Sequence, residues 1–222
     1  MFKIFINFKT YPQGTGKSAV KLAKVCGGVE GIEGFEVILI AQAVDLFRIT
    51  REVKIPVWVQ HLDFQPPGAF TGWESLEAAI EAGAAGTLLN HSEHQIPPGT
   101  VKQTIGRIRE AGGGKGFGVM ICCKTLGQME RLVKLKPDYI GYEISELIAT
   151  STSITDSNPK AIEHAVKICK EIPLIVGAGV HKAEDLKKAK ELGAKGVLVS
   201  SAVVLAENPK EKLLELVKAI SN

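Results

Sequence analysis

A regular alternation of short apolar runs with longer segments of helical pattern is the feature that most constrains the fold of this chain. Eight runs are rich in Val, Ile, Leu and Phe and lack the apolar–polar alternation of half-exposed strands. Strands buried on both faces have this composition. The eight predicted strands are Phe2–Asn7, Phe35–Ala41, Val57–Gln60, Thr87–Asn90, Gly118–Cys122, Tyr139–Glu143, Leu174–Gly177 and Gly196–Ser200.

Eight segments with helical periodicity follow these runs. Glu74–Ile80 and Ala183–Ala189, for example, place apolar residues on one helical face and charged residues on the other. Prolines in first turns and glycines after last turns support the assignment. The eight predicted helices are Gly16–Val25, Asp45–Glu52, Trp73–Ala82, Pro98–Ala111, Thr125–Lys134, Pro159–Lys170, Ala183–Leu192 and Pro209–Ile220.

This eightfold alternation, without a linker, predicts a single (β/α)₈ barrel domain over residues 1–222. An open, doubly wound sheet is the alternative. It is disfavoured because the repeat count is eight and no Gly-x-Gly-x-x-Gly follows the first strand. Three irregular stretches exceed a tight connection, and such loops usually serve as lids, binding loops or partner contacts. They are Thr10–Thr15, His61–Gly72 and Ile144–Asn158.

Composition excludes several functional classes. The chain has 27 basic and 24 acidic side chains, a formal charge of +3, and no aromatic residues interleaved with its lysines, which disfavours nucleic-acid binding. No apolar stretch approaches the roughly 20 residues that span a bilayer, and the first ten residues do not resemble a signal peptide. We therefore expect a soluble, cytoplasmic protein without a membrane partner.

The cysteines agree with a reducing compartment. Cys26, Cys122, Cys123 and Cys169 show no metal-ligand spacing, and the adjacent pair should point to opposite faces of a strand. We expect four free thiols and no metal site, with zinc binding or a disulfide as the disfavoured alternative.

Polar residues follow the ends of the apolar runs, which in a barrel converge on one rim. Asn90, His91, Ser92 and Glu93 end the fourth run, where a buried strand has no packing reason to carry them. His91 is therefore a candidate for proton chemistry, and a structural, helix-capping histidine is the alternative. The other strand ends contribute Asn7 and Lys9, Gln60 and His61, Glu143, Gly177 and Gly179, and Ser200 and Ser201.

Two charged residues of this set suggest catalysis. Glu143 ends the apolar run from Tyr139, and a carboxylate there is costly unless it is paired or acts as a base. Lys9 lies two residues after Asn7, so both should face the same side. Solvated residues at loop starts are the alternative for Glu143 and Lys9.

Small residues after the seventh and eighth runs indicate an anion site. Gly177-Ala178-Gly179 and Ser200-Ser201 would let a phosphate approach the backbone N–H groups. In (β/α)₈ barrels, a phosphate commonly binds in these two loops. We therefore expect a phosphorylated ligand.

Together these motifs resemble those of the triosephosphate isomerases, and the shorter archaeal form fits best. The resemblance extends over essentially the whole chain in the family's order. It rests on Asn7-Phe8-Lys9, Phe70-Thr71-Gly72, Asn90-His91-Ser92-Glu93, Tyr142-Glu143, Gly177-Ala178-Gly179 and Gly196–Ser201.

The resemblance implies interconversion of dihydroxyacetone phosphate and D-glyceraldehyde 3-phosphate through an enediol, in glycolysis and gluconeogenesis, without metal or organic cofactor. It implies that Glu143 abstracts the proton next to the carbonyl and that His91 polarises the carbonyl oxygen. Triosephosphate isomerase is itself the standard example of a neutral imidazole whose pKa is lowered at a helix start. We expect that state for His91.

The remaining roles also come from the resemblance. Lys9 would offset negative charge and Asn7 would orient it, with Glu93 and Asn90 as supporting residues. The other residues expected to bind the substrate are Phe8, Ile148, Gly177, Gly179, Ser200 and Ser201.

The segment after Glu143 departs from the family. Members normally have a proline directly after the glutamate and glycines at the end of the lid, whereas this chain has neither. Without the proline, φ is less restricted at the first hinge of the lid, and without the glycines, positive φ is disfavoured at the second hinge. We therefore expect that the chemistry is retained and that closure of the lid is impaired. The lid residues are Ile144, Ser145, Glu146, Leu147, Ile148, Ala149, Thr150 and Ser151.

Two alternative functions stay open, and the resemblance implies one kind of assembly. The chain could be a lid-degraded paralogue that binds triose phosphate without efficient turnover. Another phosphate-binding barrel enzyme would leave Asn7, Lys9, His91 and Glu143 unexplained. The loop His61–Gly72 corresponds to one that family members insert into a neighbouring subunit, so the resemblance implies a homodimer or, as commonly in archaea, a homotetramer. An ordinary surface loop is the alternative.

Overall fold

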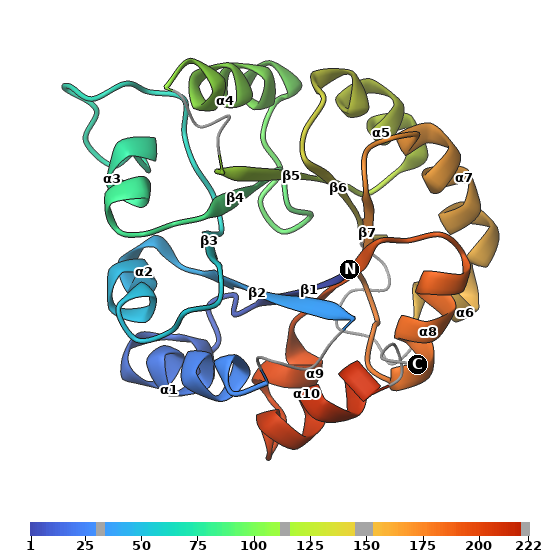
Figure 1. The fold of residues 1–222 in the computed structure, drawn as a ribbon. Coiled ribbons are helices and arrows are strands. Elements are labelled where there is room, and N and C mark those ends of the chain that lie inside the picture. Colours follow the sequence, from blue (N-terminus) through green and yellow to red (C-terminus); the bar gives the residue numbers. More distant parts are fainter. Residues whose placement is uncertain (30–33, 112–115, 145–152, 219–222) are drawn as a thin grey trace.

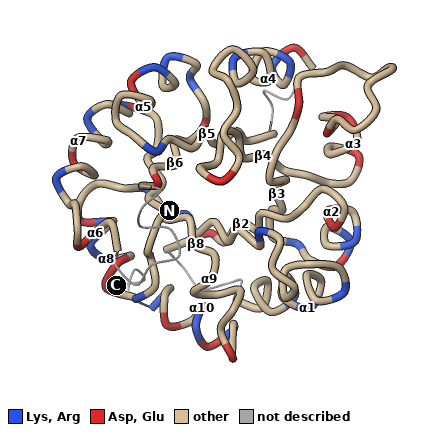
Figure 2. The backbone as a smooth tube through the Cα atoms, turned by 180° about the vertical axis from the view of Figure 1, so that it is seen from behind, with Lys and Arg blue, Asp and Glu red and all other residues tan. Residues whose placement is uncertain are grey.

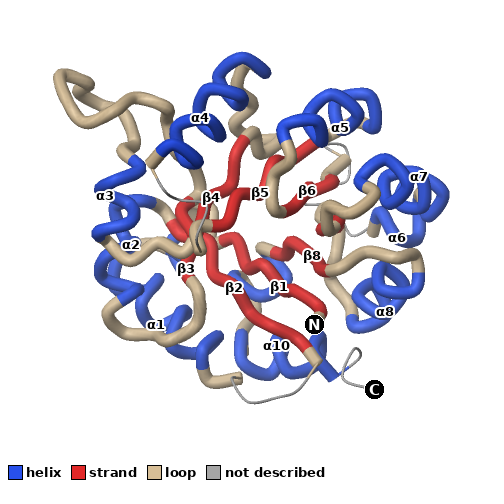
Figure 3. Tube along the Cα trace, turned by 45° about the horizontal axis from the view of Figure 1, so that its top comes forward, coloured by secondary structure: helices blue, strands red, loops and turns tan. Residues whose placement is uncertain are grey.

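The computed structural model describes residues 1–29, 34–111, 116–144 and 153–218. Eight parallel strands form a closed barrel in the order of the sequence, and β1 pairs with both β2 and β8 (Figure 3). This closure confirms the predicted (β/α)₈ barrel and excludes the open sheet. The strands are β1 (Phe2–Asn7), β2 (Phe35–Ala41), β3 (Val57–Val59), β4 (Gly86–Leu89), β5 (Gly118–Cys123), β6 (Tyr139–Tyr142), β7 (Leu174–Val176) and β8 (Gly196–Val199).

The helices form a ring around these strands (Figure 1). Those that precede the last strand connect one parallel strand to the next, as a barrel requires. They are α1 (Gly16–Gly27), α2 (Ala43–Thr50), α3 (Leu76–Glu81), α4 (Pro98–Glu110), α5 (Leu126–Leu132), α6 (Ile154–Ser157), α7 (Pro159–Cys169), α8 (Ala183–Glu191), α9 (Ser201–Val204) and α10 (Pro209–Lys218), with 3₁₀ turns η1 (Pro12–Gly14) and η2 (Val133–Leu135).

The predicted elements are all present, and their boundaries differ by a few residues. The largest difference is at α3, which begins at Leu76 and not at Trp73, because Ser75 caps it by accepting a hydrogen bond from the backbone N–H of Ala78. Two short helices, α6 and α9, and the turn η1 were not predicted. The predicted end of the last helix, Ile220, lies outside the described residues.

Two layers of apolar residues surround the strands. A large cluster fills the space between strands and helices, and a smaller one fills the barrel interior. Burying each such Leu, Ile or Phe side chain stabilises the fold by about 1.5–3 kcal/mol. The interior cluster closes the barrel beneath the rim of strand ends. Its members are Phe5, Ile38, Ile40, Trp58, Leu88, Met120, Cys122, Ile175 and Leu198.

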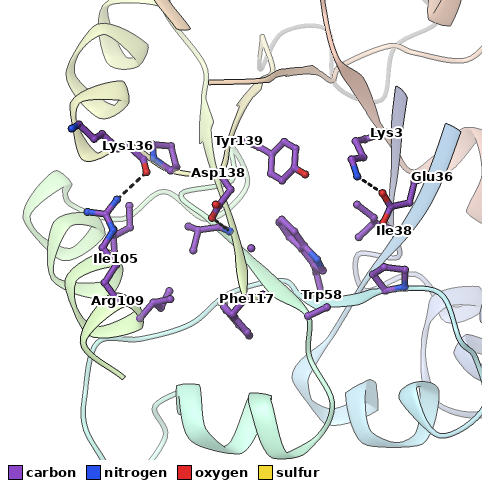
Figure 4. A pocket seen from close by; sticks show the side chains of 17 residues that line it. Lys3, Glu36, Ile38, Trp58, Ile105, Arg109, Phe117, Lys136, Asp138 and Tyr139 are labelled. Atoms are coloured by element: carbon purple, nitrogen blue, oxygen red, sulfur yellow. Dashed lines mark hydrogen bonds and ion pairs between the residues drawn. The ribbon is translucent and has the colours of Figure 1, made fainter. Parts of the chain in front are cut away.

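The amino-terminal end of the barrel has a cavity of about 340 Å³ (Figure 4). Trp58 and Tyr139 lie near its centre, with ring centroids 5.8 Å apart, and Lys3 forms an ion pair with Glu36 at its edge. A Cβ at Gly118 would lie 2.3 Å from the Trp58 ring, so glycine is required there for the tryptophan to fit. In (β/α)₈ barrels this end contributes to stability, whereas active sites lie at the carboxyl ends of the strands.

Within the described residues all four cysteines are free and buried. Cys122 belongs to the interior cluster and its neighbour Cys123 to the outer one, which confirms that the adjacent pair faces opposite ways. Burial raises the pKa of Cys26, Cys123 and Cys169 to about 12. These thiols therefore stay protonated at neutral pH.

The surface carries both signs of charge. Lys and Arg residues are interspersed with Asp and Glu residues along the outer helices (Figure 2). None of the helices described is long and apolar enough to cross a membrane.

Candidate active site

A cavity at the carboxyl ends of the strands brings together most of the predicted site. Residues from both ends of the chain line it because β1 lies beside β8. Among the predicted residues it includes Asn7, Lys9, His91, Glu143, Gly179, Ser200 and Ser201. Of the other predicted residues, Phe8 and Asn90 are buried beneath the rim, and Glu93 lines the adjoining groove.

His91 and Glu143 approach each other across this cavity. Nε2 of His91 lies 3.0 Å from Oε2 of Glu143, although the angles are not those of a hydrogen bond and neither atom has another partner within the described residues. The residues are 8% and 5% exposed. A buried imidazole and a buried carboxylate thus each present an atom without a hydrogen bond to the same part of the cavity. This arrangement suits proton transfer to or from a bound molecule.

The tautomer of His91 follows from its second nitrogen. The backbone N–H of Glu93 donates a hydrogen bond to Nδ1 of His91 at 3.2 Å. Because Nδ1 is an acceptor there, the proton of the neutral ring is on Nε2, the atom that faces Glu143. The neutral imidazole is therefore a donor into the cavity.

The pKa of His91 differs from expectation. Burial lowers it, but the carboxylates of Glu143 and Glu93 raise it more, so that its pKa lies above the ordinary value. The expected helix start is also wrong: the chain makes a turn in which the N–H of His94 bonds the carbonyl of His91, and α4 begins only at Pro98. A lowered pKa for His91 is thus contradicted in this arrangement.

Lys9 is held in place by the residues predicted to orient it. Its backbone has φ 48°, a conformation that costs a non-glycine residue about 1–3 kcal/mol. The side-chain oxygen of Asn7 accepts the Lys9 N–H at 3.0 Å, and Gln60 donates to that same oxygen and to the Lys9 carbonyl. The Lys9 ammonium lies 2.5 Å from Oε1 of Glu93. The strained turn thus directs a cation toward the cavity.

Asn90 supports the turn that carries His91. Its backbone is left-handed, with φ 59°, which Asn tolerates better than most residues. Its side chain donates to the carbonyl of Cys122 at 2.8 Å and accepts from the N–H of Ile96 at 3.1 Å. These bonds anchor the His91 turn to β5.

Gly177 lies against the Glu143 side chain, a contact that was not predicted. It does not line the cavity; a Cβ there would lie 2.6 Å from Cγ and 2.8 Å from Oε1 of Glu143. Glycine therefore leaves space for the carboxylate. The next two residues, Ala178 and Gly179, line the cavity and have φ 69° and 68°.

Ser200 and Ser201 form the other side of this end of the cavity. Ser201 begins the short helix α9, and the carbonyl of Ser200 accepts the N–H groups of Val203 and Val204. The Ser200 hydroxyl is buried without a hydrogen-bond partner in the described part of the chain. Together with Gly179, these residues form a small polar part of the cavity lining.

A family model described as triosephosphate isomerase matches residues 2–220. The chain belongs to the triosephosphate isomerase family. The predicted resemblance is thereby confirmed.

Archaeal relatives support this membership over the full length. A triosephosphate isomerase of Methanocaldococcus jannaschii is 37% identical, over 98% of this chain and 99% of that protein. Those of Methanosarcina barkeri and Methanosarcina acetivorans are 36% and 34% identical, over 98% of both chains.

Several of the residues predicted from the resemblance to triosephosphate isomerases belong to the lid. Ile144 is described and packs, partly buried, against the outer core. The substrate-binding residue Ile148 and the lid residues Ser145, Glu146, Leu147, Ala149, Thr150 and Ser151 lie outside the described residues.

Sequence reasoning missed two polar residues of the cavity, Tyr11 and His181. Both lie within a few residues of a strand end, the signal that identified the others. It also left Gln60 without a role, although its amide joins Asn7 to Lys9. Within the described ranges, no group of three or more His, Cys, Asp or Glu residues is placed to hold a metal ion.

Proposed function

We propose that this chain interconverts dihydroxyacetone phosphate and D-glyceraldehyde 3-phosphate by proton transfer through an enediolate. The observation that carries the proposal is the 3.0 Å approach of His91 Nε2 to Glu143 Oε2, both without hydrogen-bond partners, in a cavity that ends in Gly179, Ser200 and Ser201. Membership of the triosephosphate isomerase family supports the choice of substrate.

In this mechanism Glu143 is the general base. Its carboxylate takes a proton from the carbon next to the carbonyl and returns it to the neighbouring carbon. His91 donates its Nε2 proton to the carbonyl oxygen and recovers a proton from the other oxygen. Lys9 offsets the negative charge that develops between them.

The electrostatics of the pair favour this order of events. While Glu143 is ionised, its charge raises the pKa of His91. Once the carboxylate has taken the substrate proton, it is neutral and that influence ends, so the lowering effect of burial remains. His91 is then a neutral donor when the enediolate needs one.

An isomerisation assay tests the proposal. Purified wild-type protein should convert glyceraldehyde 3-phosphate, and Glu143→Asp, which withdraws the carboxylate by about one methylene, should lower kcat on the order of 10²-fold. His91→Ala should lower it by about 10²–10⁴-fold. Inactive wild-type enzyme would refute the proposal, and an undiminished Glu143→Asp variant would refute the role of Glu143.

The unusual lid sequence supports a second candidate, a protein that binds triose phosphate with inefficient turnover. The absent proline and glycines are the observation behind it. Rapid binding of substrate with a kcat below about 1 s⁻¹ would favour this candidate, since typical kcat values are about 1–10³ s⁻¹.

We also propose that the chain forms a homo-oligomer through the loop of residues 61–72, which projects from the barrel between β3 and α3 (Figure 1). A groove of about 850 Å³ lies beside this loop, and Trp73, Phe70 and Val44 nearby are 49%, 43% and 76% exposed. Such exposed apolar residues suit an interface. A tetramer and a cytoplasmic location are part of this proposal.

Light scattering during size-exclusion chromatography tests the assembly. We expect a mass of at least twice 23.8 kDa at micromolar concentration. Val44→Lys, which places a charge at the exposed apolar surface, should shift the protein toward monomer. A monomeric wild type would contradict the proposal.

A further inference from the structure

Asp185 is a buried carboxylate outside the groups that take part in proton transfer. It lies in the first turn of α8 and is only 5% exposed. Ionised carboxylates are costly to bury unless hydrogen bonds compensate. The partners of Asp185 therefore indicate what it holds together.

One oxygen of Asp185 holds the loop at the anion end of the cavity. Oδ2 accepts the backbone N–H groups of His181 and Lys182, both at 2.9 Å. This loop continues directly from Ala178 and Gly179, and His181 itself lines the cavity. The carboxylate thus fixes the end of the turn that begins at the cavity wall.

The other oxygen reaches a different element. Oδ1 accepts the hydroxyl of Thr155, in α6, at 3.2 Å, and the hydroxyls of Thr155 and Ser153 are 2.7 Å apart. A second bond joins the same two segments, from the N–H of Ile154 to the carbonyl of Ala178 at 3.3 Å. Thr155 is fully buried and Ser153 nearly so.

Helix capping alone does not explain this arrangement. A cap needs a side chain that accepts one or two N–H groups of its own helix start, which Ser, Thr or Asn also provides. Here the same carboxylate binds a hydroxyl 30 residues away. The bond from the Thr155 hydroxyl to Asp185 joins the loop after β7 to the segment that follows β6. These two segments lie on adjacent parts of the rim, because β6 and β7 are paired.

We propose that Asp185 is a positioning residue that fixes the backbone of residues 178–182 against α6 and thereby sets the phosphate-binding geometry. The proposal rests on the proposed triose-phosphate isomerase function. In this role Asp185 acts on the phosphate end of the substrate and not on the end where the proton is transferred. Loss of Asp185 weakens interactions with the phosphate, whereas Glu143 and His91, held by β6 and the β4 turn, keep their positions.

Three variants test the proposal. Asp185→Ala removes all three bonds, and Thr155→Val removes the bond from Thr155 to Asp185 together with the contact between the Thr155 and Ser153 hydroxyls. Asp185→Asn preserves the network, because its amide oxygen accepts the two N–H groups and its NH₂ donates to the Thr155 hydroxyl, which turns toward Ser153. Asp45→Ala is the matched control: Asp45 is 2% exposed, lies in the first turn of α2 across the barrel and accepts the N–H of Gly16 at 2.8 Å (Figure 1).

The measurements are the Ki of inorganic phosphate, KM and kcat for glyceraldehyde 3-phosphate, and kcat/KM for glyceraldehyde, which lacks the phosphate. For Asp185→Ala we expect Ki and KM to rise on the order of 10- to 100-fold, with glyceraldehyde isomerisation within about twofold of wild type. Thr155→Val should give a smaller rise of the same kind, and Asp185→Asn should restore values near wild type.

Two results would overturn the role of Asp185. One is an effect of Asp185→Ala on phosphate Ki no larger than that of Asp45→Ala at equal folded fraction. The other is an equal loss for glyceraldehyde and its phosphate, which indicates general distortion. If Asp185→Ala does not fold, Thr155→Val decides between the same outcomes. A wild type without isomerase activity refutes the proposed function instead, and calorimetric phosphate binding to the variants still tests Asp185.

Discussion

At the scale of residues, the proximity of His91 and Glu143 governs the properties of both. They follow β4 and β6, and neither Nε2 of His91 nor Oε2 of Glu143 has a hydrogen-bond partner among the described residues. The charge of Glu143 opposes the desolvation of His91 and raises its pKa. The ionisation state of one group therefore depends on that of the other.

Replacement of Glu143 should lower the pKa of His91. Glu143→Gln keeps the shape of the side chain and removes its charge, which leaves burial as the larger influence on the pKa of His91. In the wild type the folded pKa of His91 lies above its unfolded value. The contribution of this contact to the free energy of unfolding is therefore present at low pH and is lost as pH rises through the folded pKa. Titration of the His91 ring by NMR in wild type and variant measures the shift, and an unchanged or higher pKa in the variant would contradict it.

Gly177→Ala should impair the base without changing its chemistry. The new Cβ would lie within 2.6–3.0 Å of three atoms of the Glu143 side chain and would displace the carboxylate. A displacement of about 1 Å costs on the order of 10²-fold in rate. Steady-state kinetics should show the loss mainly in kcat. A variant with wild-type kcat would show that Glu143 has no need of this space.

Much of the catalytic set could be predicted from single strand ends. His91, Glu143 and Lys9 each stand out as polar residues directly after apolar runs, and the structure brings them into one cavity. The pKa of His91 could not be predicted, because its main raising influence is a carboxylate 52 positions along the chain. The contact of Gly177 with Glu143 could not be predicted either, because it depends on how the ends of the neighbouring strands β6 and β7 lie relative to each other.

At the scale of elements, periodicity predicted the long helices and the buried strands. Helices α6 and α9 have four residues each and were missed, because one turn is too short to show a hydrophobic period. Both lie at the site: α9 begins at Ser201, and α6 is tied to Asp185.

Gly106→Ala should stabilise α4. Gly106 is inside the helix, has no positive φ, and a Cβ there meets no atom within 4 Å. Alanine in place of glycine should therefore raise the free energy of unfolding by about 0.4–1 kcal/mol, chiefly by restricting the unfolded chain. Denaturant titration measures the change, and kcat should stay at the wild-type value. This variant also serves as the control for Gly177→Ala.

At the scale of the whole molecule, closure of the barrel creates the site. Pairing of β1 with β8 places Lys9, near the start of the chain, in the same cavity as Ser200 and Ser201, near its end. An open sheet with the same strands would separate these residues. The proximity of the Lys9 cation, the base Glu143 and the anion end of the cavity therefore depends on closure of the barrel.

Isomerisation in deuterium oxide tests the central claim most directly. If Glu143 removes a proton to give an enediolate, some of these protons exchange with solvent before Glu143 returns them, and NMR or mass spectrometry should find deuterium on the carbon next to the carbonyl in part of the product. Glu143→Gln should abolish both turnover and incorporation. Turnover and deuterium incorporation by Glu143→Gln at the wild-type rate would contradict proton transfer by Glu143.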